Sequence, residues 1–194
     1  MAQNEVTSAC RLLVIGGSAG SLEVLLEVLP NLRANLPFPI LIVMHRKSAV
    51  ESTLEELLAT RTRLKVKEAE DKEILCDGVI YVAPADYHLL VEKNGTLSLD
   101  YSEKIHYCRP AIDVTFETAA DTVGNRLVCL LLSGANADGA SGLRKAAAAG
   151  ALPLIQDPAS ADMNYMPAAG LAAVRNAKIV AVEEMATLIN NLAQ

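Results

Sequence analysis

Long apolar runs, a signal peptide and a basic charge excess are all missing from this sequence. Although 52% of the 194 residues are hydrophobic, none of the apolar runs approaches the length that is needed to cross a bilayer. The first ten residues lack the basic start and the apolar core of a signal peptide. We therefore expect a cytoplasmic protein that does not insert into a membrane.

Closely spaced cysteines are also missing. The four cysteines, Cys10, Cys76, Cys108 and Cys129, include no C-x-x-C pair. This spacing argues against a thiolate metal site or a redox motif, so we expect reduced thiols and no bound metal. Cys129 lies in the apolar run 127–132 and is interpreted as a small core residue. The net charge of -6 argues against nucleic acid as a partner and offers no basic surface to anionic lipid.

The length fits one domain over residues 1–194, and no repeat, linker or low-complexity segment interrupts it. Apolar runs alternate with amphipathic segments, which predicts a doubly wound α/β fold with a mostly parallel sheet covered by helices on both faces. The expected strands are 12–15, 39–44, 126–132, 152–155 and 179–182, and the expected helices follow Gly20 and cover Ser48 to Arg63, 143–149, a short segment after Pro167 and a last segment from Glu183.

The middle of the chain changes its period. Short alternating segments at 64–68, 79–82, 89–91 and 96–99, with Asn94-Gly95 between the last two, predict a small antiparallel insert. Arg109-Pro110 then predicts the start of a helix with proline in its first turn, and Gly124 predicts its end.

The segment Gly16-Gly17-Ser18-Ala19-Gly20 satisfies the G-x-S-x-G pattern between a predicted strand and a predicted helix. Such a turn presents a serine hydroxyl beside the free N–H groups of a helix N-terminus, which suits acyl transfer and makes Ser18 a candidate nucleophile. The same turn suits phosphate binding, and Ser18 as a simple helix cap is a third interpretation. The motif alone does not decide among them.

Parallel sheets bind ligands beyond the carboxyl ends of their strands, and three polar residues follow the strongest predicted strands. They are Ser18, His45 and Asp138. A serine, an imidazole and a carboxylate at one edge are the set that acyl transfer needs. Asp138 can instead cap the helix after Gly139. His88 and His106 lack this placement and are weaker candidates for the base.

Six ordered segments carry a family resemblance. They are Val14-Ile-Gly-Gly-Ser-Ala-Gly20, Met44-His45, Tyr81-Val-Ala-Pro-Ala-Asp-Tyr-His88, Arg109-Pro-Ala-Ile-Asp113, Leu132-Ser-Gly-Ala-Asn-Ala-Asp-Gly139, and Gln156-Asp157 with Tyr165-Met-Pro167. With these segments the chain resembles the catalytic domain of CheB-type protein-glutamate methylesterases of bacterial chemotaxis over nearly its whole length.

The resemblance implies a Ser18, His45 and Asp138 triad, an oxyanion hole made by the backbone N–H groups of Ala19 and Ala135, and no metal or organic cofactor. It implies hydrolysis of γ-methyl esters on glutamates of methyl-accepting chemotaxis receptors with release of methanol, and deamidation of receptor glutamines. The partners would be the cytoplasmic helices of methylated receptors.

The chain departs from the family pattern at the turn and in the loop. The family usually has threonine and glycine where this sequence has Ala19 and Ser21, and methionine where it has Ala135. About ten residues precede the first predicted strand, too few for a receiver domain, so we expect no phosphorylation-controlled gating from within this polypeptide. A catalytically weak relative that binds receptors or signalling proteins, and a nucleotide or coenzyme binder, are the alternative functions.

Overall fold

A computed structural model describes residues 10–45 and 54–192 of the chain. The strands are β1 (Leu12–Gly17), β2 (Ile40–Met44), β3 (Lys65–Glu68), β4 (Val79–Val82), β5 (His88–Val91), β6 (Leu97–Asp100), β7 (Leu127–Leu131), β8 (Leu152–Gln156) and β9 (Lys178–Val180). The helices are α1 (Ser21–Val28), α2 (Leu54–Ala59), α3 (Ile112–Val123), α4 (Ala140–Ala148), α5 (Tyr165–Ala173) and α6 (Val182–Asn191). The predicted alternation of strands and helices is confirmed.

Seven of these strands form one sheet in the order β3-β4-β2-β1-β7-β8-β9, and every neighbouring pair is parallel. The chain builds the sheet outward from β1, first toward β2 and later toward β7. The strand order therefore reverses at β1, and such a switch point is where doubly wound sheets bind their ligands.

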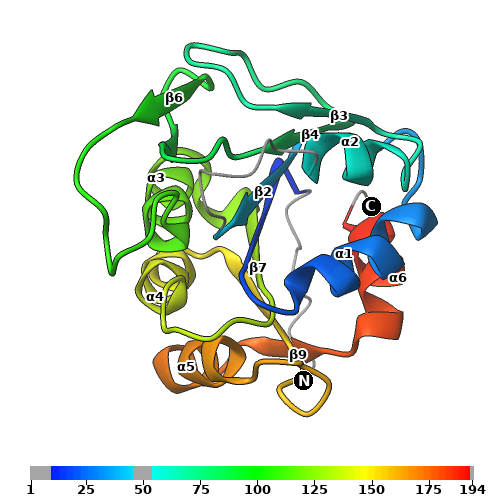
Figure 1. Cartoon of the computed structure of the whole chain (residues 1–194), viewed down its shortest axis with the longest axis vertical. Helices are drawn as coiled ribbons and strands as arrows, with labels where there is room; N and C mark the ends of the chain where they lie inside the picture. Colours follow the sequence, from blue (N-terminus) through cyan, green and yellow to red (C-terminus); the bar gives the residue numbers. More distant parts are fainter. Residues whose placement is uncertain (1–9, 46–53, 193–194) are drawn as a thin grey trace, which may run out of the picture.

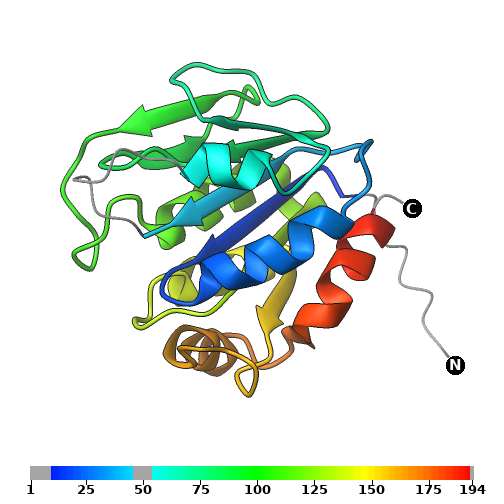
Figure 2. The same ribbon diagram turned by 45° about the vertical axis from the view of Figure 1, so that its right-hand side comes forward.

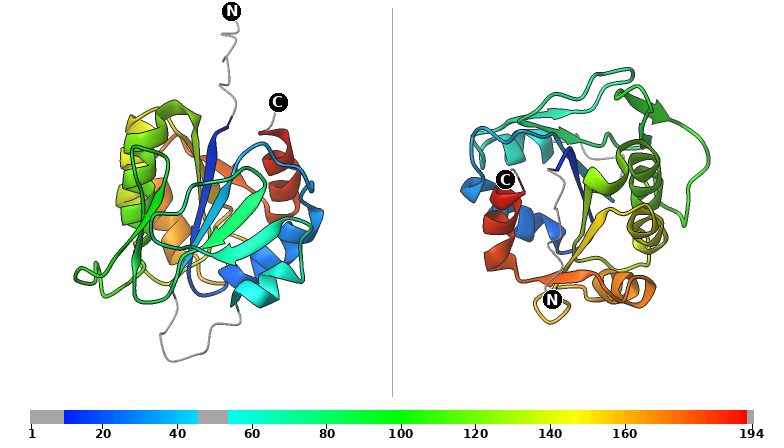
Figure 3. Two further views of the ribbon diagram at one scale, coloured as in Figure 1. Left: turned by 90° about the horizontal axis from the view of Figure 1, so that it is seen from above. Right: turned by 180° about the vertical axis from the view of Figure 1, so that it is seen from behind.

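Helices cover both faces of the sheet (Figures 1 and 3). Helices α1, α2 and α6 lie on one side, and α3, α4 and α5 lie on the other. Along β1, Leu13 and Ile15 belong to the first of two buried clusters, while Leu12 and Val14 belong to the second. Because side chains of a strand alternate between faces, a continuous apolar run supplies both cores at once.

The predicted antiparallel insert is smaller than expected. Strands β5 and β6 pair antiparallel, but β3 and β4 join the large sheet in parallel (Figure 2). Three consecutive side chains of β4, Ile80, Tyr81 and Val82, are buried, which is typical of a strand covered on both faces. The alternating pattern of β3 instead reflects its position at the edge of the sheet, where part of each side chain reaches solvent.

Several helix boundaries also differ from the prediction. Helix α4 begins at Ala140 instead of residue 143, α6 begins at Val182 instead of Glu183, and α5 begins at Tyr165, because Pro167 fits inside the first turn of a helix. The first residues of the helix expected from Ser48 to Arg63 lie outside the described residues, and its end is at Ala59. There the Thr60 hydroxyl donates to the Leu57 carbonyl at 2.7 Å, and the Arg61 N–H donates to the Leu58 carbonyl, which closes the last turn early. Helix α3 begins at Ile112, two residues after Pro110, because Ala111 keeps an extended backbone.

Among residues 10–45 and 54–192, no helix combines the length and the apolar character that a membrane span requires.

Candidate functional site

Strand register places Ser18 and His45 next to each other at the carboxyl edge of the sheet. Gly17 at the end of β1 pairs with Met44 at the end of β2, so Ser18 and His45 are the next residues at the same level. The His45 N–H donates to the Gly17 carbonyl at 3.3 Å, which ties the two strand ends together. On the other side of β1, the Ser18 N–H donates to the Ser133 carbonyl at 2.9 Å, and Ser133 follows β7.

The turn after β1 depends on Gly20. Its φ of 79° lies in the left-handed region, and a Cβ there would come within 2.6 Å of the Asp162 Cβ. Gly20 is the N-cap residue of α1, and no side chain caps this helix. The interpretation of the Ser18 side chain as a helix cap therefore finds no support. The first N–H group of α1, that of Ser21, donates to the Ser18 backbone carbonyl at 3.1 Å.

His45 forms a close pair with Asp138. Its Nε2 lies 2.7 Å from the Asp138 Oδ2, and the two side chains are 12% and 0% exposed. Burial by itself would raise the pKa of Asp138, but hydrogen bonds from His45 and from the Asp113 and Ile112 N–H groups outweigh it and hold that pKa below its usual value. An ionised carboxylate accepts the Nε2 proton, so the lone pair of a neutral His45 lies on Nδ1.

Asp138 is fixed by backbone donors from another helix. Its carboxylate accepts the N–H groups of Ile112 at 2.7 Å and Asp113 at 3.0 Å, the first two residues of α3, and that of Gly139 at 2.9 Å. The sequence suggested a cap on the helix after Gly139, but the helix that Asp138 caps is α3. The carboxylate is therefore held in one orientation against the imidazole, which a triad acid requires.

Two residues that the sequence analysis did not select lie beside the His45 Nδ1. The Cys108 Sγ is 3.6 Å from this nitrogen, and the Asn136 Nδ2 is 3.5 Å from it and 3.4 Å from the Cys108 Sγ. Burial, then the charge of Asp138, raise the pKa of the Cys108 thiol, so the sulfur stays protonated and is a poor nucleophile. Asn136 belongs to a segment of the family resemblance and Cys108 directly precedes another, and this placement is the sequence signal by which they could have been found.

The Ser18 hydroxyl makes no hydrogen bond to His45 in the described part of the chain. Its carbonyl accepts the Ser21 hydroxyl and N–H, which fixes the backbone of the turn. The hydrogen bond between a nucleophile and its base often forms only when substrate binds, so proximity at the strand ends is the relevant geometry here.

The two N–H groups predicted to stabilise an oxyanion are those of Ala19 and Ala135. Neither N–H has a hydrogen-bond partner among the described residues, whereas the neighbouring Gly134 N–H donates to the Met163 carbonyl at 3.0 Å. Both alanines are exposed. An oxyanion hole needs unpaired donors of this kind, and the assignment of these two N–H groups stays a prediction.

Two other residues that the sequence analysis considered, His88 and Cys129, have structural roles. His88 is buried, its Nδ1 accepts the Ala111 N–H at 3.1 Å, and its Nε2 contacts the Glu103 carbonyl at 3.0 Å. Both ring nitrogens therefore serve the structure. Cys129 is fully buried in β7, as predicted for a core residue.

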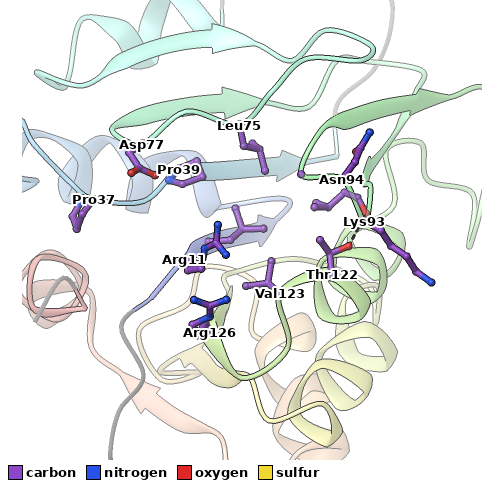
Figure 4. A pocket seen from close by; sticks show the side chains of 13 residues that line it. Arg11, Pro37, Pro39, Leu75, Asp77, Lys93, Asn94, Thr122, Val123 and Arg126 are labelled. Carbon is purple, nitrogen blue, oxygen red and sulfur yellow. Dashed lines mark hydrogen bonds between the residues drawn. The ribbon is translucent and has the colours of Figure 1, made fainter.

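A pocket of about 350 Å³ lies at the other end of the sheet (Figure 4). Arg11, Pro39 and Arg126, which line it, directly precede β1, β2 and β7. Ser18, His45 and Asp138 follow these same strands, so the length of the strands separates the pocket from them. This pocket is not part of the candidate active site.

Comparisons with known proteins agree with this architecture. The chain is 38% identical over 182 residues to a putative protein-glutamate methylesterase/protein-glutamine glutaminase of Leptospira interrogans, with 94% of both sequences covered. It is 36% identical over 160 residues to the protein-glutamate methylesterase/protein-glutamine glutaminase of Thermotoga maritima, which covers 81% of this chain and 46% of that protein.

The crystal structure of the Thermotoga maritima CheB methylesterase catalytic domain superimposes with a TM-score of 0.89 at 30% identity. The match covers 95% of this chain and all of that one. The model of the CheB methylesterase family matches residues 13–189. By fold and by sequence, this chain belongs to the CheB methylesterase family.

Proposed function

We propose that this protein hydrolyses γ-methyl esters of glutamate residues in the cytoplasmic helices of methyl-accepting chemotaxis receptors and releases methanol. It acts as one catalytic domain in the cytoplasm, and deamidation of receptor glutamines follows the same chemistry. The observation that carries the proposal is the hydrogen bond between His45 and the buried carboxylate of Asp138, at the strand ends where Ser18 also lies.

Ser18 is the proposed nucleophile and the Nδ1 of His45 is the proposed base. Nδ1 takes the hydroxyl proton as the Ser18 oxygen attacks the ester carbonyl, and Asp138 stabilises the imidazolium that forms. The imidazolium then returns this proton to the departing methoxide, which leaves as methanol. Water activated by Nδ1 hydrolyses the acyl-enzyme and releases the glutamate carboxylate. The N–H groups of Ala19 and Ala135 hold the oxyanion in both steps.

Methanol release from methylated receptor fragments tests this proposal. We expect release with the native protein and none with Ser18→Ala, which keeps its fold because little packing is lost at this partly exposed position. Ser141→Ala, a change at an exposed serine of α4, is the matched control and should retain full activity. Near-native release by Ser18→Ala would contradict the assignment of the nucleophile. Binding of fragments without release by the native protein would favour the catalytically weak relative.

A further inference from the structure

Three side chains that ligate metals converge on the base side of the site. One ligating atom from each of His45, Cys108 and Asp138 lies within 4.8 Å of the other two. Among the described residues, this is the group of histidine, cysteine and acidic side chains that meets such a spacing. Cys108 has no part in the proposed hydrolysis, so its position against the imidazole calls for a separate explanation.

We propose that the Cys108 Sγ and the His45 Nδ1 bind Zn²⁺ or a similar soft divalent cation, and that the bound ion inhibits the enzyme. The binding stands on the geometry of the two ligands. The inhibition rests also on the proposed function, because it requires that His45 is the base.

The separation of the two ligand atoms fits this ion. A tetrahedral zinc ion lies about 2.3 Å from a thiolate and about 2.0 Å from an imidazole nitrogen, which places the two ligand atoms about 3.5 Å apart. The Cys108 Sγ and the His45 Nδ1 are 3.6 Å apart. The two side chains can therefore hold the ion without a movement of the backbone.

Asp138 completes an arrangement that is common around metal-bound histidines. Such a histidine usually donates its second ring N–H to a carboxylate, which fixes the tautomer and makes the ligating nitrogen more basic. Here Nε2 donates to the Asp138 Oδ2 at 2.7 Å and leaves the lone pair on Nδ1, the nitrogen that faces Cys108.

The backbone holds Cys108 in place. Its N–H donates to the Ile105 carbonyl at 2.8 Å, and its carbonyl accepts the Ile105 N–H at 3.1 Å. The next residue, Arg109, donates to the carbonyls of Tyr101 and Ser102 and stacks over the Tyr101 ring. Cys108 and His45 are both partly exposed, so an ion can reach them from solvent.

Asn136 occupies the space between the two ligands. Its amide nitrogen contacts both ligand atoms, which shows that they point toward a common position, and it must turn aside when the ion binds. The ion accepts the Nδ1 lone pair and displaces the thiol proton of Cys108 to solvent, while water fills the remaining coordination positions. An imidazole nitrogen that is bonded to zinc cannot take the proton of Ser18, so hydrolysis stops.

Binding is measured first without any substrate. Titration of the native protein with Zn²⁺ by calorimetry, and with Co²⁺ by absorption, should give one ion per chain and a thiolate-to-cobalt charge-transfer band. Cys108→Ser should lose this band and bind Zn²⁺ at least about tenfold more weakly. Cys76→Ser, a change at an exposed cysteine outside the site, is the matched control and should bind like the native protein. Mg²⁺, which prefers oxygen ligands, should not bind.

Inhibition is measured next by methanol release, with each variant compared with its own metal-free rate. Zn²⁺ should inhibit the native protein and Cys76→Ser at the concentration where it binds, EDTA should reverse the effect, and Cys108→Ser should need at least about ten times more Zn²⁺. Equal Zn²⁺ binding by Cys108→Ser and the native protein would overturn the site. Binding through Cys108 without inhibition would overturn its effect on catalysis. A chain that binds Co²⁺ through Cys108 but never releases methanol supports the site and contradicts the proposed function.

Discussion

Asp138 and Asp113 bind the N-termini of each other's helices. Asp138, which precedes α4, accepts the first N–H groups of α3, and Asp113, in the first turn of α3, accepts the Gly142 N–H of α4 at 2.6 Å. The N-termini of the two packed helices are therefore linked by two carboxylates, and one of these, that of Asp138, also holds His45. Proposed catalysis and helix packing depend on the same side chain.

Asp138→Asn should lower both the rate and the stability. By analogy with other triads, we expect the rate of methanol release to fall roughly ten thousandfold, because an amide does not hold the imidazole in the required tautomer. The amide NH₂ would also meet backbone donors that now bond to a carboxylate, at a cost of about 1–3 kcal/mol in the free energy of unfolding. Turnover assays and urea unfolding measure the two effects. A rate loss below tenfold would mean that Asp138 serves mainly as a cap.

Asp113→Asn should change how stability depends on pH. Burial raises the pKa of Asp113 to about 6, an effect that the Gly142 N–H opposes and the charge of Asp138 reinforces. In the unfolded chain an aspartate titrates near ~3.9, so between about pH 4 and 6 the folded state binds more protons. The contribution of Asp113 to the free energy of unfolding therefore decreases as pH rises through this window.

Urea unfolding between pH 4 and 7 tests this effect. Relative to Asp113→Asn, the native protein should lose stability as the pH rises, because the amide stays neutral throughout. Asp121→Asn, at an exposed acidic residue of the same helix, controls for the loss of one negative charge. If the free energy of unfolding changed with pH in the same way for the native protein and Asp113→Asn, the raised pKa of Asp113 would be contradicted.

Gly20→Ala should damage the turn that presents Ser18. Gly20 has a φ of 79°, and a Cβ would meet both the Asp162 side chain and the Ser133 Oγ within 2.7 Å. Gly95 has a similar φ of 81° with open space around it, so Gly95→Ala carries the cost of the left-handed backbone alone, about 1–2 kcal/mol. We expect Gly20→Ala to lose more stability than Gly95→Ala and to lose most of its turnover. If both variants lost equal stability and equal turnover, the side chains of Asp162 and Ser133 would have moved away from the new Cβ without cost.

Ser133→Ala should loosen the same turn from the other side. The buried Ser133 hydroxyl donates to the Ala19 carbonyl at 2.7 Å and accepts the Met163 N–H at 2.9 Å. Its removal leaves both groups without this partner, which costs about 1–3 kcal/mol. Thermal or urea unfolding measures this loss, and Ser141→Ala serves as the control. Unchanged stability would indicate that water replaces the hydroxyl.

Much of the fold was predictable because its signals are local. Continuous apolar runs at Leu12–Gly17, Ile40–Met44 and Leu127–Leu131 favour buried parallel strands wherever they occur in such a chain. The rule that ligands bind at the carboxyl ends of these strands then selected Ser18, His45 and Asp138 without any knowledge of distances.

Other features depend on residues far apart in the chain. Strands β3 and β4 have an ambiguous local pattern, and their pairing with β2 decides that they run parallel in the large sheet. Helix α3 begins at Ile112 because the carboxylate of Asp138, a residue of another loop, accepts its first N–H groups. No propensity near Arg109-Pro110 encodes that donor and acceptor pair.

The sequence by itself determined the alternation of strands and helices and the edge at which the polar residues gather, because hydrophobic burial and chain direction set both. Tertiary structure alone decided which nitrogen of His45 is free and what lies beside it. Asp138 occupies Nε2, and a loop 63 residues along the chain brings Cys108 to Nδ1. Contacts of this kind follow from the packing of distant loops, which no local pattern in the sequence records.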